Sequence, residues 1–217
     1  MPDLIFAIEG VEVTASAAAP TLAFQLRISN FDPEERIHTV VLRTQIQLEA
    51  VRRRYSPEER QALVELFGQP EQWAQSLASV LWTHTTVVVP PFQGNTGLSM
   101  PVPCSFDFNA AATKYFAGLE HGEAPVLFLF SGSVFYAPAD GALQVAPIAW
   151  DREARFRLPV ERWKQMMDAY YPNSVWFRLP RDLFEKLSRY KVRKGLAGWD
   201  QALESLLAEA PGAVVRA

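Results

Sequence analysis

Histidine and cysteine, the side chains most suited to metal binding and nucleophilic catalysis, are sparse in this chain. His38, His84 and His121 lie far apart, and none has a Cys, Asp or Glu at the spacing of a metal-ligand pair. Cys104, the single cysteine, alternates with Phe106 in an apolar segment, where a thiol usually acts as a small buried hydrophobe. We therefore predict no metal, no cofactor and no catalytic residue.

Sequence motifs of common enzymes are also absent from the chain. No G-x-S-x-G, Walker, Rossmann or H-E-x-x-H pattern occurs. The acidic pairs Glu34-Glu35 and Glu58-Glu59 fall at a turn and at a helix start, where capping and the helix dipole explain them. The residues thus favour a binding function over catalysis.

Two basic clusters are the candidate residues for binding a partner. They are Arg52, Arg53 and Arg54 in the first cluster and Arg189, Lys191, Arg193 and Lys194 in the second. Charge runs of this kind are commonly solvated faces, but they also suit an acidic partner or RNA. Because exposed charges contribute little to folding, reversing the charges of Arg52, Arg53 and Arg54 should weaken partner binding and its salt dependence and leave the melting temperature nearly unchanged.

Composition limits the classes of partner and the cellular compartment. The 217 residues carry a net charge of −3, so no chain-wide positive field attracts nucleic acid or a membrane surface. The amino terminus lacks the basic start and apolar core of a signal peptide, and the single cysteine cannot form an internal disulfide. No apolar run is long enough to span a membrane. We expect a cytoplasmic protein.

Period-two patterns predict an antiparallel β core. The longest apolar run, Ala124–Ala137, has apolar residues on both phases, which predicts an interior strand with apolar neighbours on each face. Thr21–Asn30 and Ile37–Glu49 alternate and are joined by a turn. Leu98–Phe108 also alternates, but its two closely spaced prolines remove hydrogen-bond donors and predict an edge strand.

Helical signals interrupt and follow these strands. Ser56-Pro57-Glu58-Glu59 predicts a capping box that begins a helical hairpin over about 56–81. The last third contains amphipathic helical patterns. The predicted fold is α+β: an antiparallel, sandwich-like β core with an inserted helical hairpin and a C-terminal helical cap. The predicted domains are a β-rich core over 1–150, a helical extension packed on it over 151–210, and a loose tail over 211–217.

Several short phrases stand out along most of the chain. They are Leu22–Asn30, Glu34–His38, Arg52–Glu59, Leu81–His84, Val102–Phe108, Leu129–Tyr136 and Arg189–Arg193. Together they resemble a bacterial family of uncharacterised domains associated with gene neighbourhoods of high-affinity nickel-iron hydrogenases. The family has no established active residues, so the resemblance implies a setting and no mechanism. Nickel delivery would favour clustered His or Cys side chains, which this chain lacks.

These observations predict a non-enzymatic accessory or assembly protein that binds another protein. The resemblance implies a hydrogenase subunit or maturation factor as that partner. The alternative is a small-ligand-binding module or an enzyme with an unrecognised carboxylate site. A deep pocket with converging titratable side chains would favour the alternative, and a flat apolar or basic patch would favour the accessory function.

Overall fold

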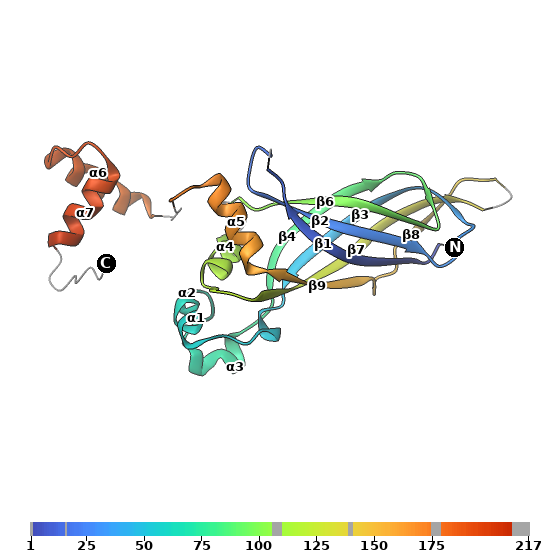
Figure 1. The fold of residues 1–217 in the computed structure, drawn as a ribbon, viewed down its shortest axis with the longest axis horizontal. Helices are drawn as coiled ribbons and strands as arrows, with labels where there is room; N and C mark the ends of the chain where they lie inside the picture. Colours follow the sequence, from blue (N-terminus) through green and yellow to red (C-terminus); the bar gives the residue numbers. More distant parts are fainter. Residues whose placement is uncertain (1, 16, 106–109, 139–140, 175–178, 210–217) are drawn as a thin grey trace. The chain divides into compact units, whose positions relative to one another are not determined.

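The structure is a computed structural model of the whole chain. It describes all residues except 1, 16, 106–109, 139–140, 175–178 and 210–217. The chain divides into two compact units, residues 1–174 and residues 175–217. The first unit is built on antiparallel strands and the second on helices (Figure 1).

Within the described residues of the first unit, the strands form two antiparallel sheets. The smaller sheet has the order β1-β2-β6, made of β1 (Leu4–Val13), β2 (Thr21–Asn30) and β6 (Asn95–Pro103). The β1–β2 register shifts between Ile8 and Gly10, as at a β-bulge. Among the described strands β6 pairs only with β2, so the predicted edge position is confirmed up to Pro103. Residues 106–108 of the predicted strand lie outside the described residues.

The larger sheet has the order β4-β3-β7-β8. Its main strands are β3 (Arg36–Leu48), β4 (Val80–Val89), β7 (Glu123–Ala137) and β8 (Gln144–Pro147). The short strand β5 (Phe92–Gln93) pairs with β3, and β9 (Glu153–Pro159) pairs with β7. Because β7 has β3 on one side and β8 and β9 on the other, the prediction that it is an interior strand is confirmed.

The core lies between the two sheets. The rings of Phe6 and Phe130 stack with centroids 4.4 Å apart, and Phe24 meets Phe128 edge-on at 5.0 Å. Phe128 is fully buried, as the sequence predicts. The opposite face of β7 differs from the prediction, because Leu127 there is only partly buried. One apolar phase of the strand builds the core, and the other faces outward without a complete covering layer.

A glycine in the middle of β7 permits its close approach to β3. Gly132 has φ of +137°, and a Cβ atom placed on it would lie 2.0 Å from the carbonyl oxygen of Val41. Such a distance is a steric clash, and such a φ disfavours any side chain. Glycine is therefore required here for the β3–β7 pairing.

The predicted insert lies between β3 and β4, but it is not a hairpin of two long helices. It consists of η1 (Ala50–Arg52), α1 (Pro57–Ala62), α2 (Val64–Phe67), η2 (Pro70–Gln72) and α3 (Trp73–Ser76). The predicted capping box at Ser56 and Glu59 is confirmed. The prediction of a helix reaching residue 81 is wrong, since Val80 and Leu81 already pair with β3 as the start of β4.

Two further helices belong to the first unit, α4 (Ala110–Ala117) and α5 (Val160–Tyr170). They lie with α1–α3 at one end of the strands (Figure 1). The ring of Trp163 on α5 stacks on Phe116 of α4 at 4.3 Å, and the Tyr170 hydroxyl donates to the carbonyl oxygen of Thr14. The boundary expected at residue 150 therefore lies after Ser174 instead, because β9 pairs with β7 and α5 packs on the core.

The second unit contains α6 (Arg181–Arg193) and α7 (Trp199–Glu209), joined by a turn in which Gly195 has φ of +68°. We call these helices and their turn the C-terminal hairpin. Its packing against the first unit stays a prediction, and the predicted loose tail over 211–217 lies outside the described residues. Among the described helices, none combines the length and apolar character needed to cross a bilayer.

Candidate functional site

The first basic cluster is divided by the fold, and its middle residue is buried. Arg53 follows η1, and its side chain is only 9% exposed beside the Glu59 side chain of α1, which is 5% exposed. Two guanidinium nitrogens of Arg53 lie 2.6 and 2.8 Å from the two carboxylate oxygens of Glu59. This bidentate pair joins the end of the β3 segment to the first turn of α1.

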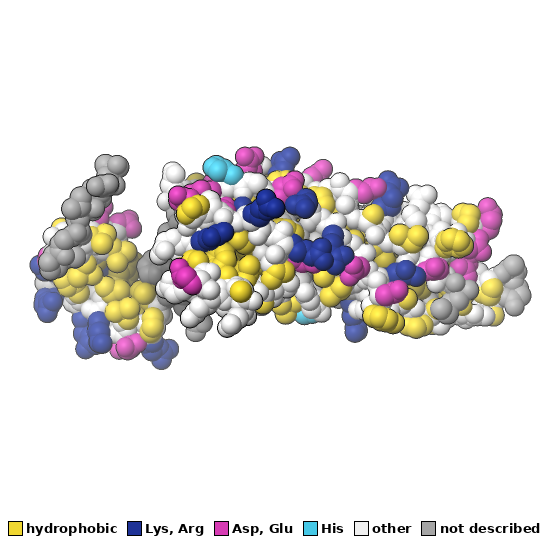
Figure 2. All heavy atoms as spheres, turned by 90° about the horizontal axis from the view of Figure 1, so that it is seen from below, with side chains coloured by type: hydrophobic (Ala, Val, Ile, Leu, Met, Phe, Trp, Pro, Cys, Tyr) yellow, Lys and Arg dark blue, Asp and Glu magenta, His cyan; other side chains and the backbone are white. Residues whose placement is uncertain are grey.

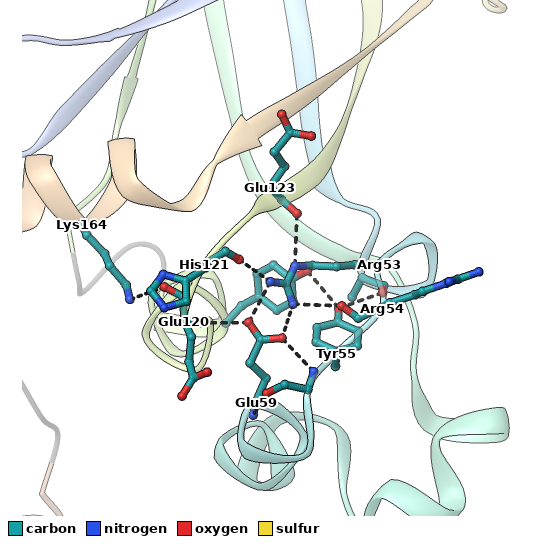
Figure 3. Close-up of polar contacts among 11 residues, drawn as sticks. Arg53, Arg54, Tyr55, Glu59, Glu120, His121, Glu123 and Lys164 are labelled. Carbon is teal, nitrogen blue, oxygen red and sulfur yellow. Dashed lines mark hydrogen bonds and ion pairs between the residues drawn. The ribbon is translucent and has the colours of Figure 1, made fainter.

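The remaining donors of Arg53 bind backbone carbonyl groups. They reach the carbonyl oxygens of Glu123 at 3.1 Å, His121 at 2.6 Å and Arg54 at 3.3 Å (Figure 3). A guanidinium group has five N–H donors, and each now has an acceptor. Arg53 thus holds the insert against the segment that leads into β7, and no N–H is left for a partner.

The carboxylate oxygens of Glu59 also have several hydrogen-bond donors around them. Its carboxylate also accepts from the backbone N–H groups of Glu120 at 2.9 Å and Ser56 at 3.1 Å. Burial opposes its ionisation, but the hydrogen bonds from Arg53, Glu120 and Ser56 outweigh this and lower the pKa of Glu59 to about 2. Lys164 of α5 donates to the carbonyl oxygen of Glu120 at 2.9 Å and extends the network to a third element (Figure 3).

Two tyrosines, Tyr55 and Tyr115, lie next to the Arg53–Glu59 pair. The guanidinium carbon of Arg53 lies 5.0 Å from the ring centre of Tyr55. The hydroxyl of Tyr55 donates to the carbonyl oxygen of Ala50 at 2.8 Å, so the Tyr115 hydroxyl, 2.9 Å away, donates to Tyr55. Burial raises the pKa of both phenols, so they stay protonated and act as neutral hydrogen-bonding groups. The cluster is a structural clamp.

This clamp corrects the interpretation of the first cluster. Arg53 cannot contact a partner without leaving the interior, whereas Arg52 and Arg54 are exposed. The predicted stability of a variant with all three charges reversed is therefore wrong for Arg53, whose reversal would bring two carboxylates together. The sequence does not distinguish the three, because only the fold places Glu59 opposite the middle one.

Arg52 instead borders a pocket that the sequence did not predict. The pocket has a volume of about 460 Å³ and is lined by Glu49 and Arg52, by Pro125 and Val126 at the start of β7, and by Arg155, Phe156 and Arg157 of β9. The Glu49 side chain is 7% exposed and lies 3.0 Å from Nε of Arg52 and 3.3 Å from Nε of Arg155. We call this cavity the arginine pocket.

The second basic cluster lies at the end of α6 and in its cap. Lys191 lies over the Trp199 ring at 5.3 Å, and Lys194 pairs with Glu209 of α7 at 2.8 Å. These two residues hold the helices together. Arg189 and Arg193 are exposed and form no ion pair among the described residues, so they are the members of this cluster best placed to meet a partner.

The C-terminal hairpin exposes much of its apolar surface. In the described part of α6 and α7, Ala202 is the one buried residue. Phe184 is 48% exposed, Val192 74% and Leu207 57%. Figure 2 shows hydrophobic side chains in the middle of the visible face of this unit and Lys and Arg side chains along its border.

Metal-binding and nucleophilic groups give no further site in the described part of the chain. No three His, Cys, Asp or Glu side chains lie close enough there to hold a metal ion. Cys104 is fully buried, and burial raises its pKa to about 12, which disfavours the reactive thiolate. Whether the purified protein carries a metal stays a prediction.

Two pocket residues, Arg155 and Arg157, were not among the predicted site residues. The alternation Glu153-Ala154-Arg155-Phe156-Arg157 is a sequence signal for two arginines on one face of a strand. From the sequence this segment is expected in the helical extension over 151–210, as a short extended stretch before a helix, so no strand of the sheet is predicted here. Their proximity to Glu49 comes from the β7–β9 pairing, which periodicity alone does not reveal.

The fold and these sites define a class: an α+β protein with an antiparallel β-sandwich core, a clamped helical insert and a C-terminal helical hairpin. The chain belongs to a family of unknown function, DUF6084, whose model matches residues 1–214. A search of curated proteins finds no match.

Several solved structures share a distant likeness with this chain. One is a β-glucosidase from Kluyveromyces marxianus, with 13% identity, a TM-score of 0.26 and 72% of this chain covered. This chain spans only 15% of that enzyme's length. A protein assigned as ApaA from Bordetella pertussis has 12% identity and a TM-score of 0.25, with 72% of this chain and 93% of that chain covered. A protein assigned to the late embryogenesis abundant group has 10% identity and a TM-score of 0.31, with 75% of each chain covered.

Proposed function

We propose that this protein is a non-enzymatic accessory protein that binds another protein through its C-terminal hairpin. The observation that carries the proposal is the hairpin's uncovered apolar surface, where only Ala202 is buried among its described residues. A pair of helices this short does not bury enough surface to be stable alone. An apolar surface of this kind generally marks a place where another surface docks.

Charge indicates the chemistry of the partner. Residues 175–217 contain eight basic and five acidic residues, a net charge of +3. The exposed Arg189 and Arg193 lie on the same helix as the exposed Val192. The expected partner surface is therefore apolar at its centre and acidic at its border, which gives attraction at a distance and burial on contact.

The resemblance to domains near hydrogenase genes suggests which proteins to test first. A subunit or a maturation factor of a high-affinity nickel-iron hydrogenase is the first partner, and the cytoplasm is the proposed compartment. The competing occupant of the hairpin face is the first unit of the same chain, because residues 1–174 carry a net charge of −6. The experiment must separate these two.

The test uses the full chain and a matched pair of double variants. Val192→Gln with Leu207→Gln replaces the two most exposed apolar side chains of the described hairpin with polar ones and spares the Phe184–Trp199 ring contact that joins α6 and α7. Val88→Gln with Val145→Gln is the control, since both side chains are exposed in the first unit. A cross-linked partner is identified by mass spectrometry, purified and titrated against each variant.

We expect the hairpin variant to weaken the affinity for the purified partner about tenfold or more, since hot-spot apolar contacts contribute at least about 1.4 kcal/mol. The control variant should bind like the wild type. Cross-links that join the hairpin only to residues 1–174 of the same chain would overturn the proposal. Equal affinity of the two variants for the partner would overturn it as well.

A further inference from the structure

The arginine pocket combines an appropriate size with an unusual density of guanidinium groups. Its volume of about 460 Å³ falls within the range of small-molecule sites. It lies where β3 leaves its sheet toward η1 and where β7 begins beside β9. In Figure 2, which looks at the side of the first unit that carries β9 and the insert, Lys and Arg side chains gather near the middle of that face.

A buried carboxylate sets the position of two of the arginines. Glu49 accepts from Nε of Arg155 and forms an ion pair with Nε of Arg52 at 3.0 Å; Arg52 comes from η1 and Arg155 from β9. Arg155 is also held by Glu153, through Nη1. Because Glu49 uses the Nε side of Arg52, both terminal nitrogens of Arg52 and Nη2 of Arg155 have no protein acceptor among the described residues.

Arg157 adds a third guanidinium group to the pocket, and no carboxylate lies within hydrogen-bond distance of it among the described residues. Its side chain is 71% exposed, and its nearest carboxylate oxygen, on Glu123, is 3.9 Å away. That separation is longer than a hydrogen bond. The β7–β9 register places Arg157 beside Pro125 and Arg155 beside Leu127, so both arginines rise from the outward face of the same strand.

We propose that the arginine pocket binds a small ligand through an oxyanion, either a phosphate monoester or a polycarboxylate. The guanidinium groups of Arg52, Arg155 and Arg157 line the pocket together with the carboxylate of Glu49, while Glu153 pairs with Arg155 and Glu123 lies 3.9 Å from Arg157. Planar guanidinium groups with free terminal nitrogens match phosphate and carboxylate oxygens in pairs. Glu49 acts as a positioning residue, because its carboxylate lies against Nε of both Arg52 and Arg155. This function is independent of the C-terminal hairpin.

The experiment titrates the full chain with inorganic phosphate and, separately, with citrate at constant ionic strength. Backbone amide shifts in ¹H–¹⁵N spectra report the position of binding. Arg157→Gln removes an exposed guanidinium that has no short ion pair, so the variant should fold. Arg162→Gln on α5 is the control, because Arg162 is exposed and its guanidinium donates to Oε1 of Gln165 at 3.3 Å.

We expect saturable shifts in residues 49–53, 125–127 and 153–157 in the wild type and in Arg162→Gln. Arg157→Gln should raise the dissociation constant about tenfold, which is the effect expected from the loss of one charge-assisted hydrogen bond. Tighter binding of phosphate identifies a phosphate monoester as the ligand class, and tighter binding of citrate identifies a polycarboxylate.

Three results would overturn the proposal. One is the absence of saturable shifts with either anion. Another is an equal loss in Arg157→Gln and Arg162→Gln, which would show general attraction to positive charge. The last is a response of these amides to an acidic peptide and to neither small anion, which would make the pocket a protein-docking surface. Loss of partner binding in the hairpin variant would leave all of these results unchanged.

Discussion

Arg53 and Glu59 lie face to face, with two guanidinium nitrogens 2.6 and 2.8 Å from the two carboxylate oxygens, and each also binds the backbone of the segment that leads into β7. The pair therefore connects the insert to the central strand of the larger sheet. Its role in stability can be measured.

Glu59→Gln should lower the free energy of unfolding by about 3 kcal/mol, because it leaves a buried guanidinium without its counter-charge. The neighbouring Glu58→Gln is the control, since Glu58 is exposed at the same helix start and should change stability by less than about 0.5 kcal/mol. Urea denaturation of both variants measures the difference. Similar stabilities of the two variants would contradict the clamp.

Glu59 also predicts a specific loss of stability in acid. Its pKa in the folded protein, about 2, lies below the ordinary carboxyl value of 4.5, so the contribution of Glu59 to stability is fully present above about pH 4.5. It is lost as the pH falls from about 4.5 through 2, where the folded carboxylate takes up a proton. The difference in unfolding free energy between the wild type and Glu59→Gln should shrink across that window and stay constant from pH 5 to pH 7. Other carboxylates that titrate in both proteins cancel in this difference. A difference that is flat down to pH 2 would refute the assignment.

The two buried phenols should differ in importance although their hydroxyl groups bind each other. Tyr55→Phe removes two hydrogen bonds: the Tyr115 hydroxyl loses its acceptor, and the Ala50 carbonyl keeps only the backbone N–H of Arg53 at 3.3 Å. The expected cost is about 2 kcal/mol. Tyr115→Phe removes one donor and leaves the Tyr55–Ala50 bond intact, so about 1 kcal/mol is expected. Thermal and urea unfolding of the two variants test this order. The reverse order would mean that the donor directions are wrong.

Gly132→Ala should be severely destabilising, by about 3 kcal/mol or more, because the added methyl group would meet the Val41 carbonyl oxygen and φ there is positive. Gly97→Ala on β6 is the matched control, since nothing lies within 4 Å of its added Cβ. Comparable unfolding midpoints for the two variants would show that β3 and β7 can separate at little cost.

The sequence alone determined the elements that depend on local chemistry. Alternation located the strands, because side chains of a strand point to opposite faces at every residue. The prolines at 101 and 103 predicted the edge strand, since missing N–H donors exclude a central position, and the pair Ser56 and Glu59 predicted the capping box. The interior position of β7 followed from its apolar residues in both phases of the strand period.

Only the tertiary structure decided which charged residues are available to partners or ligands. Arg52, Arg53 and Arg54 are alike in sequence, yet one borders the arginine pocket, one is buried in the clamp and one is exposed. Glu49 and Arg155 meet although 106 residues separate them. Such contacts depend on strand pairing between distant segments, and the burial of a charge depends on whether the fold places an opposite charge beside it. Neither property has a periodicity that a sequence could display.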